Sequence, residues 1–265
     1  MKHYLIQPTW TCQNACSYCW VRTTVLTRPA MARPTERPLE DWVAAIERDK
    51  PDLVDIAGGE PLLLPWLPDL VDACPETRFG LSTNGLAEQG IERLCERRRP
   101  NLIAVNVSYH PEAEDRWRGY RARWQRSVGL LKAAGYALGP NIVDHAANVE
   151  RARPVLRWLE GLGIRYAVSP YEESANLGHL EQQGLCCQGG VNHLNIAPDG
   201  SAWPCLTAMR SPLWEQYRLG NWLDGDLDLS RKAQPCHLWC HDYYVLAKSH
   251  PNGDMWGVQA RPCQC

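Results

Sequence analysis

Three cysteines lie close together near the N-terminus, as Cys12, Cys16 and Cys19 in the stretch TWTCQNACSYCW. No histidine lies between Cys19 and His110, so this segment offers three metal ligands rather than four. A structural zinc site closes four ligands and would need a remote fourth one. A cubane iron–sulfur cluster normally takes four thiolates, so three would leave one iron open to an outside ligand. The spacing favours the cluster with one open iron over zinc.

A second group of seven cysteines lies between Cys186 and Cys265. Twelve residues separate Cys187 from Gly200, and four more separate Gly200 from Cys205. The stretch HLNIAPDGSAW between them predicts a β-hairpin, because Pro, Asp and Gly favour a tight turn. We expect four thiolates to hold a fully ligated cluster, namely Cys187, Cys205, Cys236 and Cys240. A zinc ribbon with the same ligands is the alternative, and Cys186, Cys263 and Cys265 are further candidate ligands.

Six short apolar strands alternate with helical patterns over the first 180 residues, which predicts a parallel sheet covered by helices. Strands are expected over residues 3–9, 52–61, 77–85, 101–110, 136–145 and 164–172. Helices are expected over residues 38–50, 65–74, 86–98, 116–134 and 148–162, with Cys74 and Cys95 as buried helical residues. Six units fall short of a closed eight-unit barrel, which needs ~250 residues. The expected fold class is therefore α/β, with a partial (β/α)6 TIM-like barrel in residues 1–180 and a small cysteine-rich hairpin and helix domain in residues 181–265.

Small polar residues gather where the predicted strands end. The cysteine loop follows the first strand, Gly58–Gly59–Glu60 the second, and Ser82–Thr83–Asn84 the third. Asn106 and Ser108 are placed at the end of the fourth strand, Asn141 late in the fifth and Ser169 at the end of the sixth. Sites on parallel sheets collect at the carboxyl ends of the strands, so we expect a ligand site there.

Cys-x3-Cys-x2-Cys after the first strand of such a repeat resembles the radical S-adenosylmethionine (SAM) superfamily, and GGEP at residues 58–61 strengthens the resemblance. The resemblance implies that SAM binds the open iron of a [4Fe-4S] cluster held by the three N-terminal cysteines. It implies reductive cleavage to a 5′-deoxyadenosyl radical, which removes hydrogen from an unactivated carbon. A flavodoxin- or ferredoxin-type electron donor is the implied partner.

The resemblance also implies roles for individual residues in binding SAM. Tyr18 is expected near the adenine, and Gly58, Gly59, Glu60 and Pro61 near the methionyl amine. Ser82 and Asn84 are expected near the methionine end. Candidates for the ribose or the carboxylate are Asn106, Ser108 and Asn141, although hydrogen bonding at strand ends explains them equally well.

The C-terminal cysteines resemble the opening of the twitch and SPASM extensions of this superfamily. The Cys-x2-Cys-x5-Cys-x3-Cys run of a full SPASM extension is absent, which favours one auxiliary [4Fe-4S] cluster and a twitch-like domain. A fully ligated auxiliary cluster is suited to accept an electron from the substrate. The chain is similar in size and layout to short radical SAM dehydrogenases that oxidise an aminocyclitol, and oxidation of a small polar substrate is our first interpretation.

The candidate catalytic residues for that reaction are His110, Tyr171 and His241. Further candidates for binding the substrate are Arg22, Tyr109, His145 and Glu172. For each of these seven residues taken singly, a role as a solvated or capping residue is the better explanation. The alternative activity is maturation of a ribosomal peptide through a crosslink or epimerisation, and a sugar or nucleotide rearrangement is a third. Many peptide maturases carry a leader-binding domain before the first strand, which is not expected here because that strand begins at residue 3.

A zinc-containing nucleic-acid module is the non-enzyme alternative, suggested by arginines interleaved with aromatics in DRWRGYRARWQR. Trp117, Tyr120, Trp124, Val128 and Leu131 recur every three or four residues, which instead predicts one apolar helix face. A formal net charge of −2 also argues against a nucleic-acid partner. The absence of a signal peptide and of any ~20-residue apolar run predicts a cytoplasmic protein without a membrane partner.

Overall fold

The computed structural model describes residues 2–29, 31, 35–170, 186–187, 190, 192–228 and 234–235. Its centre is a ten-stranded sheet with the strand order β11-β10-β9-β8-β1-β2-β3-β4-β5-β6. The first six strands are β1 (His3–Ile6), β2 (Leu53–Ile56), β3 (Arg78–Thr83), β4 (Leu102–Tyr109), β5 (Asn141–Asp144) and β6 (Ala167–Pro170). Each of these pairs in parallel with the next along the chain. The sequential order agrees with the predicted α/β class and is consistent with a partial barrel.

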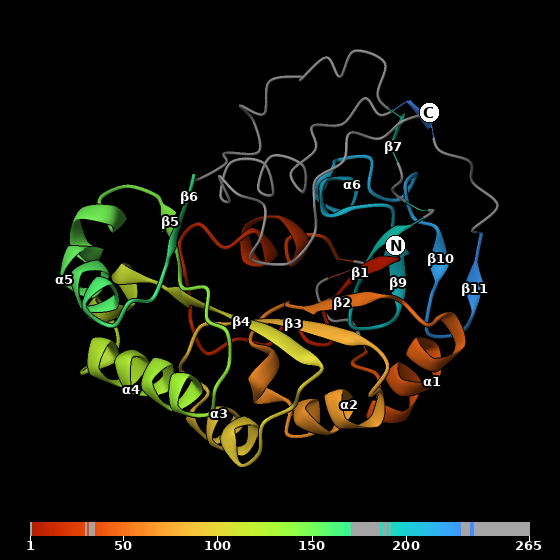
Figure 1. Ribbon diagram of the computed structural model, residues 1–265. Coiled ribbons are helices and arrows are strands. Elements are labelled where there is room, and N and C mark those ends of the chain that lie inside the picture. Colours follow the sequence, from red (N-terminus) through yellow and green to blue (C-terminus); the bar gives the residue numbers. More distant parts are fainter. Residues whose placement is uncertain are drawn as a thin grey trace.

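Five helices connect these strands along one face of the curved sheet (Figure 1). They are α1 (Leu39–Asp49), α2 (Leu67–Ala73), α3 (Glu88–Cys95), α4 (Tyr120–Ala133) and α5 (Asn148–Gly161). Short turns of helix follow three of the strands, as η1 (Val21–Val25), η2 (Pro61–Leu63) and η3 (Pro111–Asp115). The helix predicted from residue 116 begins four residues later, since Gly119 precedes it in the left-handed region with φ 74°.

The helix-facing side of the sheet carries the hydrophobic core. Alternate strand residues such as Tyr4, Ile6, Val54 and Ile56 are at most 1% exposed and pack beneath the helices. Tyr120 and Trp124, two of the aromatic residues predicted to line one helix face, are buried on α4 as expected, whereas Trp117 precedes the helix and is only partly buried. Because side chains alternate along a strand, the intervening residues must face the other, concave side of the sheet.

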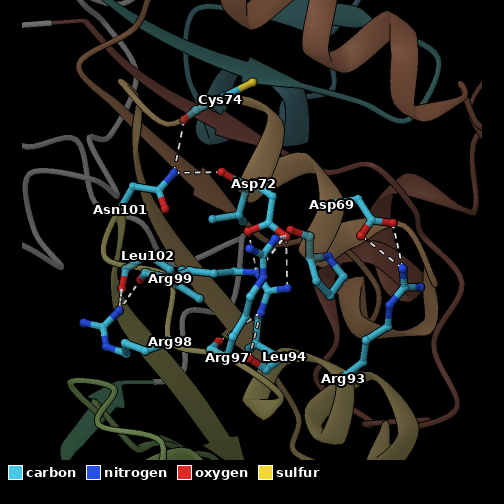
Figure 2. Close-up of polar contacts among 12 residues, drawn as sticks. Asp69, Asp72, Cys74, Arg93, Leu94, Arg97, Arg98, Arg99, Asn101 and Leu102 are labelled. Atoms are coloured by element: carbon cyan, nitrogen blue, oxygen red, sulfur yellow. Dashed lines mark hydrogen bonds and ion pairs between the residues drawn. The ribbon is translucent and has the colours of Figure 1, made fainter.

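The arginines that follow α3 form contacts within the protein, which hold the connection between α3 and β4 in place (Figure 2). Arg99 is 5% exposed, and its Nε and Nη2 atoms each lie 3.0 Å from an oxygen of Asp72 on α2. Asn101 donates to the carbonyls of Val71 and Cys74, at 2.8 and 3.1 Å. These contacts tie α2 to the start of β4, and Cys74 is fully buried as the sequence predicted.

The predicted hairpin forms and joins the same sheet. It consists of β8 (His193–Ile196) and β9 (Ser201–Trp203), followed by α6 (Leu206–Arg210), β10 (Gly220–Asn221) and β11 (Asp226–Leu227). β8 pairs in parallel with β1, with His3 opposite His193 and Ile6 opposite Ile196. Within the described ranges, residues 193–228 therefore share a sheet and a core with the N-terminal repeats, while a boundary near residue 180 stays a prediction.

A separate two-stranded ladder pairs β7 (Cys186–Cys187) with β12 (Gln234–Pro235). Cys187 lies opposite Gln234, and Cys186 opposite Pro235. Among the helices described, none has the length and apolar character that a bilayer crossing requires.

Candidate functional site

The cysteine loop leaves the carboxyl end of β1 and leads into η1, which lies on the opposite side of the sheet from α2–α4 (Figure 1). Cys12 is exposed, Cys16 is buried and Cys19 is half-buried. Burial raises the pKa of the Cys16 thiol to about 12, with the neighbouring Cys19 and Glu112 adding to the shift. A thiolate at this position therefore needs a bound cation, as a metal ligand has.

The glycines after β2 bring two backbone segments into contact. Gly59 N donates to Thr9 O and Glu60 N donates to Thr11 O, each at 2.8 Å. Gly58 has φ 127°, and a Cβ atom at Gly58 or Gly59 would collide with the backbone oxygen of Thr9 or Thr11, respectively. Only glycine allows this approach, so the GGE segment lies directly against the start of the cysteine loop.

The carboxylate of Glu60 points into the protein rather than toward a ligand. It is fully buried, and its Oε1 atom accepts hydrogen bonds from Thr83 Oγ1 at 2.7 Å and Leu62 N at 3.1 Å. Its Oε2 atom accepts from Asn84 N at 2.7 Å. Burial raises the pKa of Glu60 to about 7, although these three hydrogen bonds oppose the shift. Glu60 thus joins the ends of β2 and β3, and only its backbone faces the loop.

Asn84, predicted near the methionine end of SAM, contacts the cysteine loop itself. Its Nδ2 atom lies 3.5 Å from the sulfur of Cys12, and its Oδ1 atom accepts from Gln13 Nε2 at 3.3 Å. Asn14 N donates to the same sulfur at 3.4 Å. Donors of this kind stabilise a thiolate, as second-shell groups around metal ligands do.

The concave face of the sheet carries the other polar residues predicted for SAM. Ser82 pairs with Asn106 across β3 and β4, and Ser108 pairs with Asn141 across β4 and β5. Ser169 Oγ donates to Asn141 Oδ1 at 2.8 Å. Because residues paired in parallel strands share a face, these side chains line one continuous surface. Asn106 Oδ1 is buried and has no hydrogen-bond partner among the described residues, as expected for a group that meets a ligand.

Tyr18 lies between two histidines that follow β4 and β5. Its hydroxyl is 2.8 Å from His110 Nδ1, and its ring centre is 5.2 Å from that of His145. Burial lowers the pKa of His110 to about 4, so the imidazole is neutral near pH 7, and its tautomer sets whether Nδ1 accepts from the Tyr18 hydroxyl or donates to it. His110 therefore lies beside the residue that the resemblance places near the adenine.

Two expectations need correction. Tyr109, a candidate for gripping substrate, is fully buried on the helix side of β4, where its ring packs on Tyr120 and Trp124. Asn141 begins β5 instead of lying late in it, because residues 136–140 precede the paired segment. Arg22 is exposed on η1. The other predicted site residues lie outside the described ranges, namely Tyr171, Glu172, Cys236, Cys240, His241, Cys263 and Cys265, and the side chains of Cys186 and Cys187 are not described.

A polar cluster on the concave face of β8, β1 and β2 was not predicted from the sequence. His3 Nε2 lies 2.6 Å from Asp55 Oδ2, and the His3 ring meets that of His193 edge-on at 5.2 Å. Asp55 stands in the otherwise apolar strand LVDI, and this break in the pattern was the available signal. The cluster was hidden because the partner of Asp55, His3, is 52 residues away in the chain, and His193 is 190 residues from His3.

Cys205 lies on the same side of the sheet as the cysteine loop. It is the residue before α6, and its sulfur accepts from Ala208 N at 3.3 Å. α6 and η1 share a hydrophobic cluster against which Cys19 and Cys205 both pack. Arg28, just after η1, donates to the carbonyls of Met209 and Arg210, each at 2.6 Å. The hairpin region is thereby held against the N-terminal cysteine loop.

These residues fit the two cofactors that the resemblance implies. Cys12, Cys16 and Cys19 are free thiols, and two donors point at the sulfur of Cys12. The glycine segment and Asn106 offer backbone and side-chain groups to SAM. In the part of the chain that the structure covers, no three His, Cys, Asp or Glu side chains converge as one metal ion requires. A cubane needs no such convergence, because each thiolate binds a different iron.

A family model for the radical SAM superfamily matches residues 6–144, which is more than half of the chain. The chain belongs to the radical SAM superfamily. It is therefore a radical SAM enzyme, and its cofactors are SAM and a [4Fe-4S] cluster. The zinc-containing nucleic-acid module is set aside on this ground.

The matches to known proteins cover most of this chain, well beyond the residues of the family model. The PqqA peptide cyclase of Methylocella silvestris is 24% identical in an alignment 290 positions long, which covers 96% of this chain and 70% of that protein. Streptococcus suis SuiB bound to SAM has a similar fold, with a TM-score of 0.61 and 18% identity over 86% of this chain. This chain spans 64% of that structure. Native anSMEcpe with bound SAM and a peptide matches with a TM-score of 0.60 and 17% identity, over 86% of this chain and 79% of that one.

Proposed function

We propose that this radical SAM enzyme modifies a peptide by removing two hydrogen atoms and forming a new bond, as in a carbon–carbon or thioether crosslink. The observation that carries the proposal is the alignment with a peptide cyclase over 96% of this chain, which reaches far beyond the SAM-binding repeats. The concave face supports it, since its half-buried polar residues continue from β8 to β6 and offer an extended binding surface. Oxidation of a small polar substrate, the first interpretation from the sequence, is the second candidate.

Cys12, Cys16 and Cys19 are the proposed ligands of the SAM-binding cluster. The proposed SAM contacts are Tyr18, the backbone of Gly58 to Pro61, Ser82, Asn84, Asn106, Ser108 and Asn141. When bound, the cluster and SAM supply the 5′-deoxyadenosyl radical that takes a hydrogen atom from the substrate. The chain's own part is to orient the two partners and to exclude water.

Both candidate reactions also release a proton and a second electron from the substrate. An auxiliary [4Fe-4S] cluster held by Cys187, Cys205, Cys236 and Cys240 is the proposed acceptor of that electron, and cluster potentials of about −700 to +450 mV cover such a role. The β7–β12 ladder supports this ligand set, because it pairs Cys187 with Gln234, two residues before Cys236.

The cluster assignments are tested by iron content and SAM cleavage. Protein purified without oxygen should hold about eight irons, four for each cubane. Replacing Cys12, Cys16 and Cys19 together by alanine should abolish 5′-deoxyadenosine formation and leave roughly half of the iron. Replacing Cys205 and Cys240 should remove the other half and preserve SAM cleavage. Deoxyadenosine formation by the N-terminal triple variant would show that the ligand assignment is wrong.

The substrate class is tested by co-expression with short peptides encoded beside the gene, followed by mass spectrometry. A crosslink lowers the peptide mass by two hydrogen atoms, and the N-terminal triple cysteine variant provides the control. Unchanged peptides, together with oxidation of an aminocyclitol by the same preparation, would favour the dehydrogenase candidate instead.

A further inference from the structure

A carboxylate from a distant segment grips the cysteine loop between two of its cysteines. Ser17 N donates to Glu112 Oε1 at 2.6 Å, and Ser17 Oγ donates to Glu112 Oε2 at 2.8 Å. Both carboxylate oxygens are therefore used on one residue that stands directly after Cys16. Glu112 belongs to η3, which follows β4, so the contact joins positions 95 residues apart.

Arg116 connects Glu112 to the segment between Cys12 and Cys16 as well. Its Nη2 atom lies 3.6 Å from Glu112 Oε1 and donates to Asn14 Oδ1 at 3.2 Å. Asn14 is 4% exposed, and its Oδ1 atom also accepts from Ala15 N at 3.1 Å. The Glu112–Arg116 pair thus binds one residue on each side of Cys16. Asn14 lies between Cys12 and Cys16, and Ser17 lies between Cys16 and Cys19.

The segment that carries this pair is itself firmly attached. His110 N, in the residue before η3, donates to the hydroxyl of the buried Tyr120 on α4 at 2.8 Å. Glu114 accepts from Arg121 on α4, and Ala113 is fully buried beneath the helices. A carboxylate on such a support can impose its position on a loop, whereas an exposed ion pair between two mobile side chains contributes little.

We propose that Glu112 is a positioning residue for the SAM-binding cluster, which shapes the cysteine loop and sets the charge beside Cys16. This inference rests on the proposed role of Cys12, Cys16 and Cys19 as ligands. Charge-assisted hydrogen bonds are about twice as strong as neutral ones, which explains a carboxylate at this position rather than an amide. The negative charge of Glu112 also acts on Cys16 and disfavours further negative charge there.

The two effects predict different readouts. Loss of the bidentate contact loosens the loop, so the cluster should assemble more slowly and be lost more readily. Loss of the negative charge favours the reduced cluster, which carries one more electron, so its midpoint potential should rise. A residue that served only the fold would change thermal stability without moving this potential.

Two variants of Glu112 separate geometry from charge. Glu112→Gln keeps the size and removes the charge, and Glu112→Asp keeps the charge and withdraws the carboxylate by one methylene. Glu92→Gln is the matched control, because Glu92 forms an exposed ion pair with Arg126 between α3 and α4. Ser17→Ala removes one hydrogen bond from the other side and serves if Glu112→Gln fails to fold.

The measurements are iron content after anaerobic reconstitution, the electron paramagnetic resonance signal with and without SAM, and a potentiometric titration of the SAM-responsive cluster. We expect Glu112→Gln to lower the iron content and raise the potential, Glu112→Asp to lower the iron content at the wild-type potential, and Glu92→Gln to change neither. We expect Ser17→Ala to lower the iron content as Glu112→Asp does. Wild-type iron content and potential in Glu112→Gln, or in Ser17→Ala where the former does not fold, would overturn the proposal.

The proposed function fails in a different way. If the wild-type protein showed no signal that responds to SAM, or if the triple cysteine variant still cleaved SAM, the ligand assignment itself would be wrong. A SAM-responsive wild-type cluster with unaltered Glu112 variants would reject only the positioning role.

Discussion

At the scale of single residues, the site is organised by carboxylates that point away from the ligands. The carboxylate of Glu60 accepts hydrogen bonds from Thr83 and Asn84, and both carboxylate oxygens of Glu112 accept hydrogen bonds from Ser17. Each therefore fixes one backbone segment of the site relative to another. The residues proposed to touch cofactors are mostly neutral, and they depend on these buried or tethered charges for their positions.

Glu60 makes the stability of the protein depend on pH. Its pKa is raised from 4.5 to about 7, so the folded protein holds a proton that the unfolded chain releases across this window. The free energy of unfolding should fall as the pH rises from 4.5 to 7, by roughly 3 kcal/mol at most, and then level off. Urea unfolding of the anaerobic protein, measured at several pH values across this window, checks the expectation.

Glu60→Gln should remove this pH dependence, because glutamine does not titrate. It should also lower stability by about 1–3 kcal/mol, since the amide nitrogen that replaces Oε2 cannot accept from Asn84 N. Glu76→Gln, at an exposed turn before β3, is the control and should keep the wild-type pH profile. An unchanged profile in Glu60→Gln would mean that another group titrates.

At the scale of elements, the site depends on the close approach of the β2 end to the cysteine loop. Gly58 and Gly59 allow the hydrogen bonds from Gly59 N to Thr9 O and from Glu60 N to Thr11 O. The sequence analysis singled out these glycines through the resemblance, but as SAM contacts. In the structure they also shape the cysteine loop, which no local pattern in either segment indicates.

Gly59→Ala should displace the cysteine loop, because the new methyl group would collide with the backbone of Thr11. We expect loss of most SAM cleavage and a lower iron content after reconstitution. Gly129→Ala is the matched control: Gly129 lies within α4 and has open space around it. That change should leave cleavage intact and stabilise the protein by about 0.5–1 kcal/mol. Equal activity of both variants would contradict the role assigned to the close approach.

At the scale of the whole molecule, the hairpin region and the N-terminal repeats share one core. Trp222 is fully buried, donates to Asp49 Oδ2 at 2.7 Å and packs edge-on against Tyr4. Arg28 and Arg48 add hydrogen bonds from the N-terminal half to carbonyls of residues 209–223. These contacts therefore hold the region that contains Cys205 against the N-terminal half, which contains the cysteine loop.

We expect the hairpin region and the N-terminal repeats of the apo protein to unfold together in one cooperative transition. Trp222→Ala should lower the midpoint of that transition by an amount equivalent to about 3–5 kcal/mol, the usual cost of truncating a buried aromatic side chain. Circular dichroism and tryptophan fluorescence should report the same midpoint. Leu213→Ala, at a residue 50% exposed, is the control and should change little. Two separate transitions, only one of them shifted, would show that residues 181–265 fold independently.

Much of the fold was predictable because the signals for it are local. The alternation of apolar strands and amphipathic helices predicted six strands and five connecting helices in the correct order, and the Asp-Gly turn identified the β8–β9 hairpin. The helix boundary at Tyr120 and the start of β5 were missed by four or five residues, since flanking turns have no strong pattern of their own. The attachment of β8 to β1 was not predicted, because sheet order is set by which surfaces pack together.

The sequence alone determined the chemistry that this protein can perform. The spacing of Cys12, Cys16 and Cys19 and the GGEP segment sufficed to indicate the superfamily, because ligand spacing within one loop is a local property. Only the tertiary structure decided which residues shape that loop. Ser17 and Glu112 are 95 positions apart and meet because β1 and β4 end at the same edge of a parallel sheet, a relation that no stretch of sequence contains.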